Sequence, residues 1–285
     1  MAGTSALAGT MLLDTTDEIF AANRAIGRVT LNAKWADGAS RRGRVHEQGA
    51  WRVRCPGQPA GELEAMIVNT AGGMAGGDHL DLEFAVGPSA RLLVTSAAAE
   101  KVYRTLGSET IITAKLSVAA GAEMAWLPQE TILFDRARLR RTIEVDLAAD
   151  ARLLLAEAVI FGRAGMGETV ADGFLLDRWR VRRSGRLLHA ESARLDGDVA
   201  AKLAQPAVAK GGVAMANVLV VPGDEAHVAN VRTASRQCRG EVGASAWNGF
   251  AVVRLVAADG AALRHDLAHI LTSIRGGRLP RLWLH

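Results

Sequence analysis

Residues 80–86 read LDLEFAV, and this short stretch sets the pattern for much of the chain. Apolar side chains recur at every second position, and acidic side chains fill two of the positions between them. Because successive side chains of a β-strand point to opposite faces, the alternation predicts a strand with one buried face. Similar alternation marks residues 28–35, 91–95 and 110–118, and residues 252–256 are interpreted as a further strand. A Ser-Gly pair at 184–185 predicts a hairpin within residues 181–195.

Three segments depart from this alternation. Residues 151–161 (ARLLLAEAVIF) are nearly all apolar, which indicates a strand buried on both faces or a buried helix. Residues 224–238 follow a Pro-Gly turn and open with acids, as the first turn of a helix does. Residues 260–275 place apolar side chains on one helical stripe, and the glycines at 276 and 277 are expected to end that helix.

The predicted fold is therefore mainly β, a strand-rich, multi-layer sheet architecture with two α-helices near the C-terminus. The chain does not alternate strands with helices, which argues against a parallel α/β fold. Residues 196–212 are interpreted as a polar, Ala-rich mobile loop and not as a domain boundary. We expect residues 1–27 to form a poorly ordered N-terminal extension and residues 28–285 to form a single domain.

Composition excludes several classes of function. The 285 residues carry a formal charge of only +4, and arginines are interleaved with acids, which disfavours nucleic-acid binding. No apolar run approaches the length of a membrane helix, and the N-terminus makes a poor signal peptide. Cys55 and Cys238 lie far apart and form neither a metal-binding pair nor a disulfide framework. We expect a soluble, cytoplasmic protein.

The stretch 69–78, NTAGGMAGGD, raises the question of phosphate binding. No lysine follows its second glycine pair, the glycine spacing is not that of a dinucleotide fingerprint, and a strand follows where both motifs need a helix. The glycines are therefore expected to permit positive φ and close backbone approach in a turn or bulge between strands 65–69 and 80–86. The role of Asp78 beside that turn stays open.

Metal-binding and catalytic patterns are sparse. His265 and His269 share a helix face, but the residue after His265 is an aspartate and no third ligand is evident, so an exposed helix face is the simpler interpretation. Glu157 interrupts a buried apolar run, and a buried charge needs a partner, for which Arg163 is the structural candidate. No nucleophile motif is present.

Six blocks together resemble one known family. They are NTAGGMAGGD (69–78), VTSAAAEKVYR (94–104), WLPQETILF (126–134), EAVIFGRAGMGE (157–168), NGFAVVRL (248–255) and RLPRLW (278–283). In this order and spacing they are similar to the urease accessory protein UreD, called UreH in some bacteria. The resemblance runs from about residue 28 to the C-terminus.

The resemblance implies a scaffold and metallochaperone without enzymatic activity and without a tightly bound cofactor. Such a protein takes part in inserting nickel into urease. It bridges the urease apoprotein and UreF, which in turn docks the GTPase UreG, and it has no nucleic-acid or membrane partner. It also implies a passage for nickel in transit. The acids within the matched blocks are expected to line that passage or to serve the fold: Asp78, Glu130, Glu157 and Glu168.

The resemblance further suggests that four residues brace the fold or contact UreF: Lys101, Tyr103, Arg104 and Arg163. Two other functions remain open from the residues alone. One is a metal-dependent hydrolase that uses the carboxylates with His265 and His269. The other is a β-rich binding module without a metal role.

Overall fold

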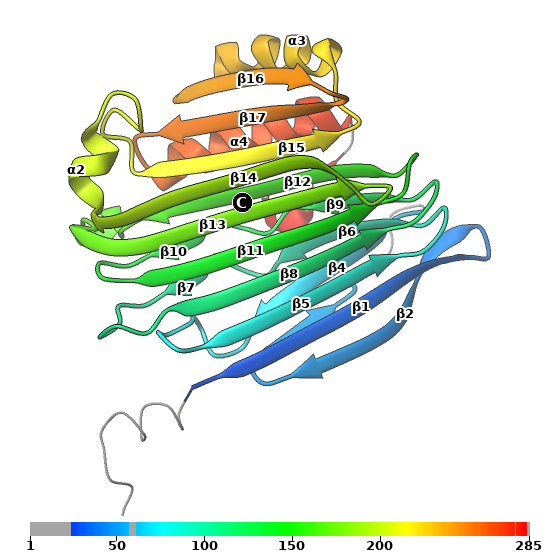
Figure 1. Cartoon of the computed structure of the whole chain (residues 1–285), viewed down its shortest axis with the longest axis horizontal. Helices are drawn as coiled ribbons and strands as arrows, with labels where there is room; N and C mark the ends of the chain where they lie inside the picture. Colours follow the sequence, from blue (N-terminus) through cyan, green and yellow to red (C-terminus); the bar gives the residue numbers. More distant parts are fainter. Residues whose placement is uncertain (1–23, 57–60, 277, 284–285) are drawn as a thin grey trace, which may run out of the picture.

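The computed structural model describes residues 24–56, 61–276 and 278–283, which form two stacked β-sheets with the two longer helices on one outer side (Figure 1). Apolar side chains from both sheets meet between them in one continuous core. Leu80, Leu82, Phe84 and Val86 all point into this core, which confirms the strand predicted from their alternation.

The front sheet in Figure 1, called sheet A, has seven strands. Its five central strands pair in parallel, and an antiparallel hairpin partner closes each edge. The predicted turn at Ser184 and Gly185 joins the last two strands, and Ser184 has φ 49. In spatial order the strands are β14 (Arg186–Asp198), β13 (Asp172–Arg183), β11 (Arg138–Leu147), β8 (Thr110–Val118), β5 (His79–Val86), β1 (Ile26–Ala36) and β2 (Ala39–Gln48).

The second sheet, called sheet B, lies behind sheet A. Four of its strands (β4, β6, β9 and β12) pair in parallel. Two short strands, β7 (Glu100–Val102) and β10 (Thr131–Leu133), pair with each other, and β10 also pairs with β12. The main order is β16 (Glu241–Trp247), β17 (Phe250–Ala257), β15 (Ala214–Val221), β12 (Arg152–Phe161), β9 (Glu123–Trp126), β6 (Arg91–Ser96), β4 (Leu63–Asn69) and β3 (Trp51–Arg54).

Between β4 and β13 the chain winds back and forth between the two sheets. It passes from β4 in sheet B to β5 in sheet A, returns to β6, and continues in this way to β13. Each strand therefore pairs in parallel with the strand laid down one winding earlier, although no α-helix lies between β4 and β13. Sequence alternation alone did not predict this parallel pairing, because it reports which face is buried and not which strand is the neighbour.

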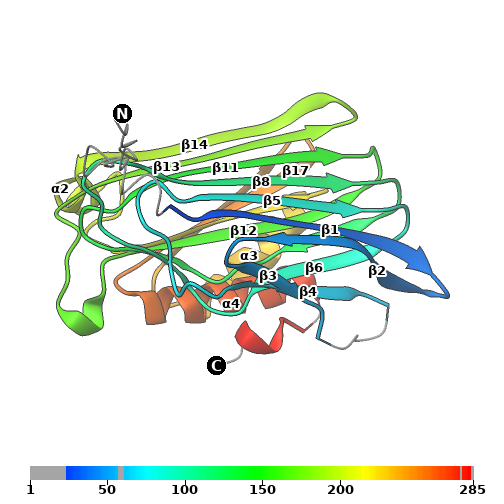
Figure 2. The ribbon, with the colours of Figure 1, turned by 90° about the horizontal axis from the view of Figure 1, so that it is seen from below.

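Strand β12 is buried on both faces, as one of the two interpretations of residues 151–161 required. Sheet A covers one face of it. The helices α3 (Glu225–Ala234) and α4 (Gly260–Arg275) cover the other side of sheet B and enclose a second apolar cluster (Figure 2). Both helices match the two that the sequence predicted.

The helix ends follow their local chemistry. The side chain of Asp224 accepts hydrogen bonds from the backbone N–H groups of Ala226 and His227, and Asp259 caps α4 in the same way. Gly276, with φ 62, ends α4 in the left-handed conformation that favours glycine. The expected partner in this stop signal, Gly277, lies outside the described residues.

Two boundaries differ from the sequence prediction. Residues 196–212, expected to be a mobile loop, contain the helix α2 (Val199–Ala204), which Asp198 caps through the N–H of Ala201. Alanine-rich sequence favours helix once a cap is present, and this outweighs the polar composition. Strand β1 begins at Ile26, so the ordered strand starts two residues before the expected boundary at 28. Residues 1–23 lie outside the described residues.

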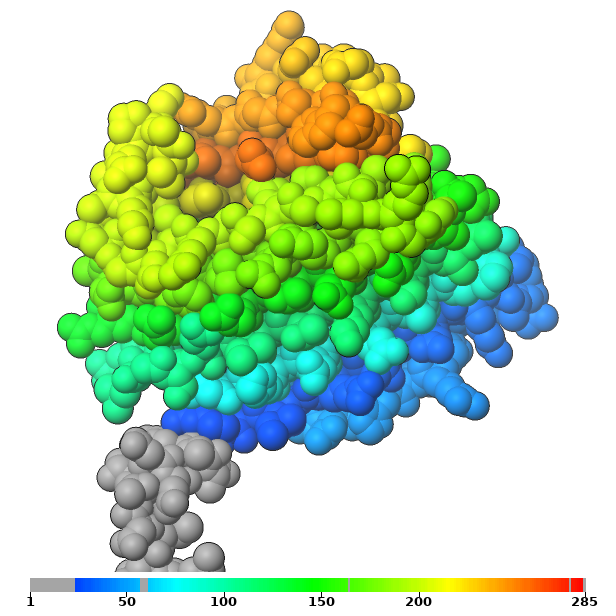
Figure 3. Space-filling view, viewed as in Figure 1, coloured from blue at the N-terminus to red at the C-terminus, as the bar shows by residue number. Residues whose placement is uncertain are grey.

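Three short 3₁₀ turns complete the described elements: η1 (Ala164–Met166), η2 (Ser235–Gln237) and η3 (Arg281–Trp283). Figure 3 shows the strands of sheet A at the molecular surface across one broad face. Within the described residues no helix is long and apolar enough to cross a membrane.

Candidate functional site

Four of the sequence blocks meet at one end of the molecule, where the parallel strands of sheet B end (left in Figure 2). We call this the loop end, formed by residues 69–78, 97–109, 127–137 and 162–169. Ligand sites in parallel sheets often form beyond the carboxyl ends of the strands, where connecting loops converge. The predicted site residues Asp78, Glu130 and Glu168 lie in these loops, whereas Glu157 lies within β12.

The glycine-rich segment is a crossover from sheet B to sheet A, and it packs directly on β7. The backbone of Met74 exchanges hydrogen bonds with Lys101 (2.7 Å) and Tyr103 (2.8 Å). A Cβ atom at Gly73 would lie 2.5 Å from the Tyr103 ring, and the Tyr103 hydroxyl donates to the Gly72 carbonyl at 2.9 Å. The expected close backbone approach is confirmed, and the segment turns between the two expected strands, which belong to different sheets.

Asp78 is buried and holds two chain segments together. One carboxylate oxygen accepts the backbone N–H of Ala25 at 2.9 Å, and the other accepts that of Ala75 at 2.7 Å. The acid therefore closes its own loop and fastens the start of β1 to it.

Glu130 joins the loop end to the helical layer. Both of its carboxylate oxygens lie 3.0 Å from Nη1 of Arg264, which projects from α4. The same guanidinium lies over the ring of Trp283, and its Nη1 also donates to the side chain of Gln129 at 2.9 Å. Glu130 is buried, so this ion pair ties sheet B to α4 and to the C-terminal turn.

Glu157 belongs to a buried cluster between the two sheets. Its carboxylate accepts hydrogen bonds from Nη1 of Arg141 and from the indole N–H of Trp126 at 2.8 Å. Arg141 also pairs with Asp177, which accepts a further hydrogen bond from Trp179 at 3.1 Å. The expected Glu157–Arg163 ion pair is wrong, because Arg163 lies in the loop beyond β12 whereas Arg141 faces Glu157 from sheet A.

Arg141 and Asp177 were not predicted, yet the sequence held a signal for them. In β11, Arg141 occurs in phase with the inward apolar positions, between Leu139 and Ile143. In β13, Asp177 likewise lies between Leu175 and Trp179. A charged residue in the buried phase of a strand requires a buried partner of opposite charge.

Burial raises the pKa of Glu157 to about 7. The Arg141 guanidinium and the Trp126 hydrogen bond lower it, whereas the neighbouring Asp177 carboxylate raises it. Arg141 carries one positive charge and faces two carboxylates, so the cluster has a surplus negative charge when both are ionised.

Glu168 pairs with Arg163 through two hydrogen bonds, of 2.8 and 3.1 Å. These bonds lower the pKa of Glu168. The Arg163 guanidinium stacks on Phe134, 4.1 Å from the ring centroid. Tyr103 packs edge-on against the same Phe134 ring, with the two ring centroids 5.0 Å apart. Arg163 and Tyr103 therefore brace the loop end, one of the two roles that the sequence suggested.

Glu100 is a further acid at the loop end that was not among the predicted site residues. It accepts a hydrogen bond from the side chain of Asn69 at 2.9 Å. Burial raises its pKa to about 7, and the carboxylate of Asp78 adds to this rise. Hydrogen bonds from Asn69 and the Lys101 backbone oppose it. The three-residue strand β7 is too short to show an alternation that would have revealed the burial.

The two helix histidines do not form a metal site with other ligands. His265 is exposed and lies 3.0 Å from the carboxylate of its neighbour Asp266. Asp266 itself accepts backbone N–H groups of Arg239 and Gly240. Throughout the described ranges, no three His, Cys, Asp or Glu side chains gather closely enough to hold a metal ion.

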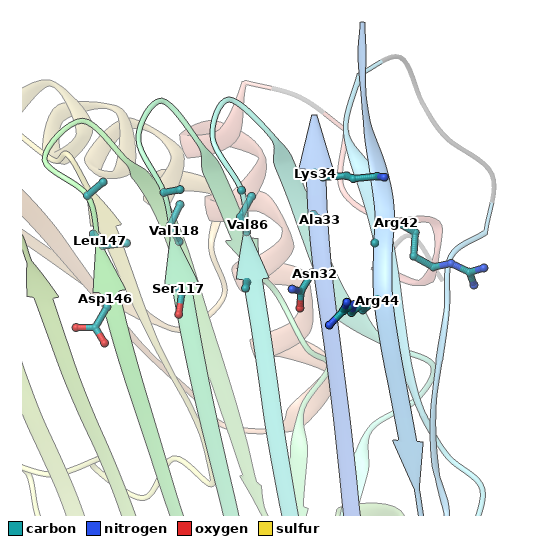
Figure 4. A pocket seen from close by; sticks show the side chains of 15 residues that line it. Asn32, Ala33, Lys34, Arg42, Arg44, Val86, Ser117, Val118, Asp146 and Leu147 are labelled. Carbon is teal, nitrogen blue, oxygen red and sulfur yellow. The ribbon is translucent and has the colours of Figure 1, made fainter. Parts of the chain in front are cut away.

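A surface pocket of about 970 Å³ lies at the other end of the molecule, on the outer face of sheet A (Figure 4). Asn32, Arg44, Ser117 and Asp146 line it from neighbouring strands (Figure 4). The pocket is wide and open, and it contains none of the predicted site residues. It therefore adds no chemistry to the loop end.

The family model described as "UreD urease accessory protein" matches residues 25–284. The chain belongs to the UreD family. It is 54% identical over 277 residues to the urease accessory protein UreD of Rhodopseudomonas palustris (strain BisA53), covering 96% of both chains. It is 52% identical over 273 residues to that of Bradyrhizobium diazoefficiens, covering 96% of this chain and 99% of the relative.

A third relative, urease accessory protein UreD 3 of Bradyrhizobium sp. (strain BTAi1), is 53% identical over 268 residues, or 94% of this chain and 96% of the relative. The resemblance inferred from the six blocks is thus confirmed. Membership of the UreD family gives the chain a role in urease maturation, and the relatives are named as accessory proteins and not as enzymes.

Proposed function

We propose that this chain is a scaffold for the insertion of nickel into urease, acting in the cytoplasm between the urease apoprotein and a UreF–UreG complex. The observation that carries the proposal is its membership of the UreD family over nearly the whole chain. On this proposal the protein is not an enzyme, nickel is its cargo, and it binds neither nucleic acid nor membrane.

Within this role, Glu157 is the acid best placed to meet nickel in transit. The surplus negative charge of its cluster is offset near neutral pH by a proton, because the pKa of Glu157 is raised to about 7. A passing divalent cation would replace that proton and find carboxylate oxygens. Oxygen ligands without a cage of His and Cys hold a transition metal weakly, so the ion can leave again.

The other three predicted acids are each held by hydrogen-bond donors that serve the fold. Glu130 and Glu168 each face one arginine, and Asp78 faces two backbone N–H groups. A cation at any of them would have to displace a donor that already holds the fold together. We therefore assign Asp78, Glu130 and Glu168 chiefly structural roles beside the nickel path.

The test uses a urease-producing strain from which this gene has been deleted. Wild-type protein should restore urease activity and the nickel content of purified urease. The Glu157→Gln variant should lower nickel content while still forming a complex with the cognate UreF on gel filtration. Glu168→Gln is the matched control, and it should leave nickel content unchanged.

Three outcomes would contradict parts of the proposal. Full nickel loading of urease with the Glu157→Gln variant would show that nickel does not contact this cluster. If the protein did not associate with purified UreF, the bridging role would be contradicted. Full urease activity without the gene would point to a binding module outside urease maturation, and turnover of an ester or amide with stoichiometric metal would point to a hydrolase.

A further inference from the structure

Six exposed side chains, some apolar and some basic, lie on adjoining loops of the loop end, and we call them the loop-end patch. Leu106 is fully exposed, Met166 is 73% exposed and Tyr103 is 36% exposed. Around them lie three exposed cationic side chains. The patch consists of Lys101, Tyr103, Arg104, Leu106, Arg136 and Met166.

The base of this patch is fixed in place. Tyr103 packs edge-on against Phe134, Arg163 stacks on the same ring, and the backbone N–H of Thr105 donates to the carbonyl of Arg136 at 3.1 Å. A surface whose supporting loops are already ordered loses less conformational entropy when a partner binds. Tyr, Met and Arg are also the residues that protein interfaces favour.

The charges of the patch are unbalanced. Within the described residues no acid lies within ion-pair distance of Lys101 or Arg104, and Arg136 reaches only Asp135, at 3.8 Å. The nearby acids are already engaged: Glu168 with Arg163, and Glu100 with Asn69. The patch therefore suits an occupant that carries both carboxylates and apolar side chains.

The described part of the chain begins directly beside this patch. The side chain of Arg24 packs against Gly77, since a Cβ atom there would lie 2.9 Å from Cδ of Arg24. The neighbouring Gly76 approaches the loop-end patch, since a Cβ atom there would lie 2.0 Å from Oγ1 of Thr105. Arg24, the first described residue, is therefore separated only by this glycine pair from Thr105, which lies between Arg104 and Leu106.

That preceding segment has the complementary composition. Residues 12–20 read LLDTTDEIF, with three acids and four large apolar side chains. The four peptide steps from residue 20 to residue 24 span at most about 14 Å, and the nine residues before them add roughly 30 Å when extended. The reach is sufficient for both the charged and the apolar side chains to meet the patch.

We propose that residues 12–20 dock on the loop-end patch of the same chain and cover it until a partner protein takes their place. The acids face Lys101, Arg104 and Arg136, and the apolar side chains cover Leu106 and Met166. A tethered segment has a high effective concentration at a site beside its attachment point, which favours it over a second copy in dilute solution. The proposal concerns the resting chain and holds whether or not Glu157 meets nickel.

Carbodiimide coupling of the full-length protein tests it, because this reagent joins a carboxylate to a lysine amine only at close contact. In the monomer band, peptide mass spectrometry should find Lys101 joined to Asp14, Asp17 or Glu18. Lys34, toward the far end of β1, and Lys115, on the outer face of sheet A, serve as internal references. Equal coupling to these two lysines, or coupling only in dimer bands, would overturn the proposal.

Tethering alone could bring the segment near Lys101, so charge variants are needed. The double variant Arg104→Glu/Arg136→Glu should lower the Lys101 coupling about fivefold, because two exposed attractions become repulsions. Arg178→Glu/Arg182→Glu makes the same charge change on sheet A and should have no effect. Equal coupling in both double variants would show that only the tether acts.

The apolar half of the contact is tested at constant charge. Leu106→Ser/Met166→Ser should also reduce coupling at Lys101. As a measurement on the unaltered chain, an excess of a synthetic peptide of residues 9–22 should compete with the tethered segment and reduce the same product. Unchanged coupling with the peptide present would refute docking at a defined surface.

Discussion

Replacing Glu100 with glutamine is expected to remove part of the pH dependence of the protein's stability. The pKa of this carboxyl is raised from 4.5 to about 7 in the folded chain, chiefly by burial. The folded state therefore holds the proton more tightly than the unfolded state. The stability that this proton contributes is fully present below pH 4.5 and is lost as pH rises through about 7.

The magnitude follows from the two pKa values. Between about pH 5.5 and pH 8, linkage gives a loss of about 2 kcal/mol of unfolding free energy from this one carboxyl. Glutamine carries no charge at either pH, and its amide oxygen can still accept the hydrogen bond that Asn69 donates. The variant should therefore lose about 2 kcal/mol less than the wild type over the same range.

Urea unfolding followed by tryptophan fluorescence measures this directly at both pH values. The comparison between variant and wild type cancels every other group that titrates, including Glu157. Glu83→Gln is the matched control, since the Glu83 side chain lies in a strand and is 54% exposed. If the Glu100 variant and the wild type lose equal stability between the two pH values, the burial argument fails.

Three further substitutions test the buried contacts. Arg141→Met should destabilise the fold by about 3–5 kcal/mol in urea unfolding, because two buried carboxylates lose their cation, and a loss below about 1 kcal/mol would contradict this. Gly73→Ala should cost about 1–3 kcal/mol through collision with Tyr103, clearly more than Gly72→Ala, which meets open space; equal costs would refute the close-approach argument. Asp78→Asn should speed amide hydrogen exchange at the two backbone N–H groups that now donate hydrogen bonds to Asp78, because an amide offers one acceptor oxygen where the carboxylate offers two. Unchanged exchange would contradict the conclusion that Asp78 holds the two chain segments together.

Local patterns in the sequence predicted the elements well. The alternation in residues 80–86 became β5, and the two amphipathic segments became α3 and α4, because burial and capping are decided within a few residues of chain. The short helix α2 was missed because a polar composition outweighed a capping aspartate in the interpretation.

The pairing of strands was beyond local patterns. Phe84 pairs with Leu116 and Leu116 pairs with Val145. The sequence of a single strand does not indicate which other strand will pair with it. The partner of Glu157 was misplaced for the same reason, since Arg163 is close in sequence and Arg141 is close in space. The in-phase charges of β11 and β13 would have narrowed the choice, since Arg141 and Asp177 stand where an apolar residue was due.

The C-terminal turn has a consequence for the newly made chain. The indole of Trp283 donates to the carbonyl of Leu127 at 3.1 Å, and the side-chain amide of Gln129 donates to the carbonyl of Leu282 at 3.1 Å. Residues 282 and 283 thus bind to a loop that is synthesised before half of the 285 residues have been made. A growing chain cannot make these two contacts until residues 282 and 283 have left the ribosome, so until then the apolar cluster between sheet B and α4 lacks the Trp283 side chain. Truncation before Trp283 would leave the same part of this apolar cluster uncovered in the folded protein.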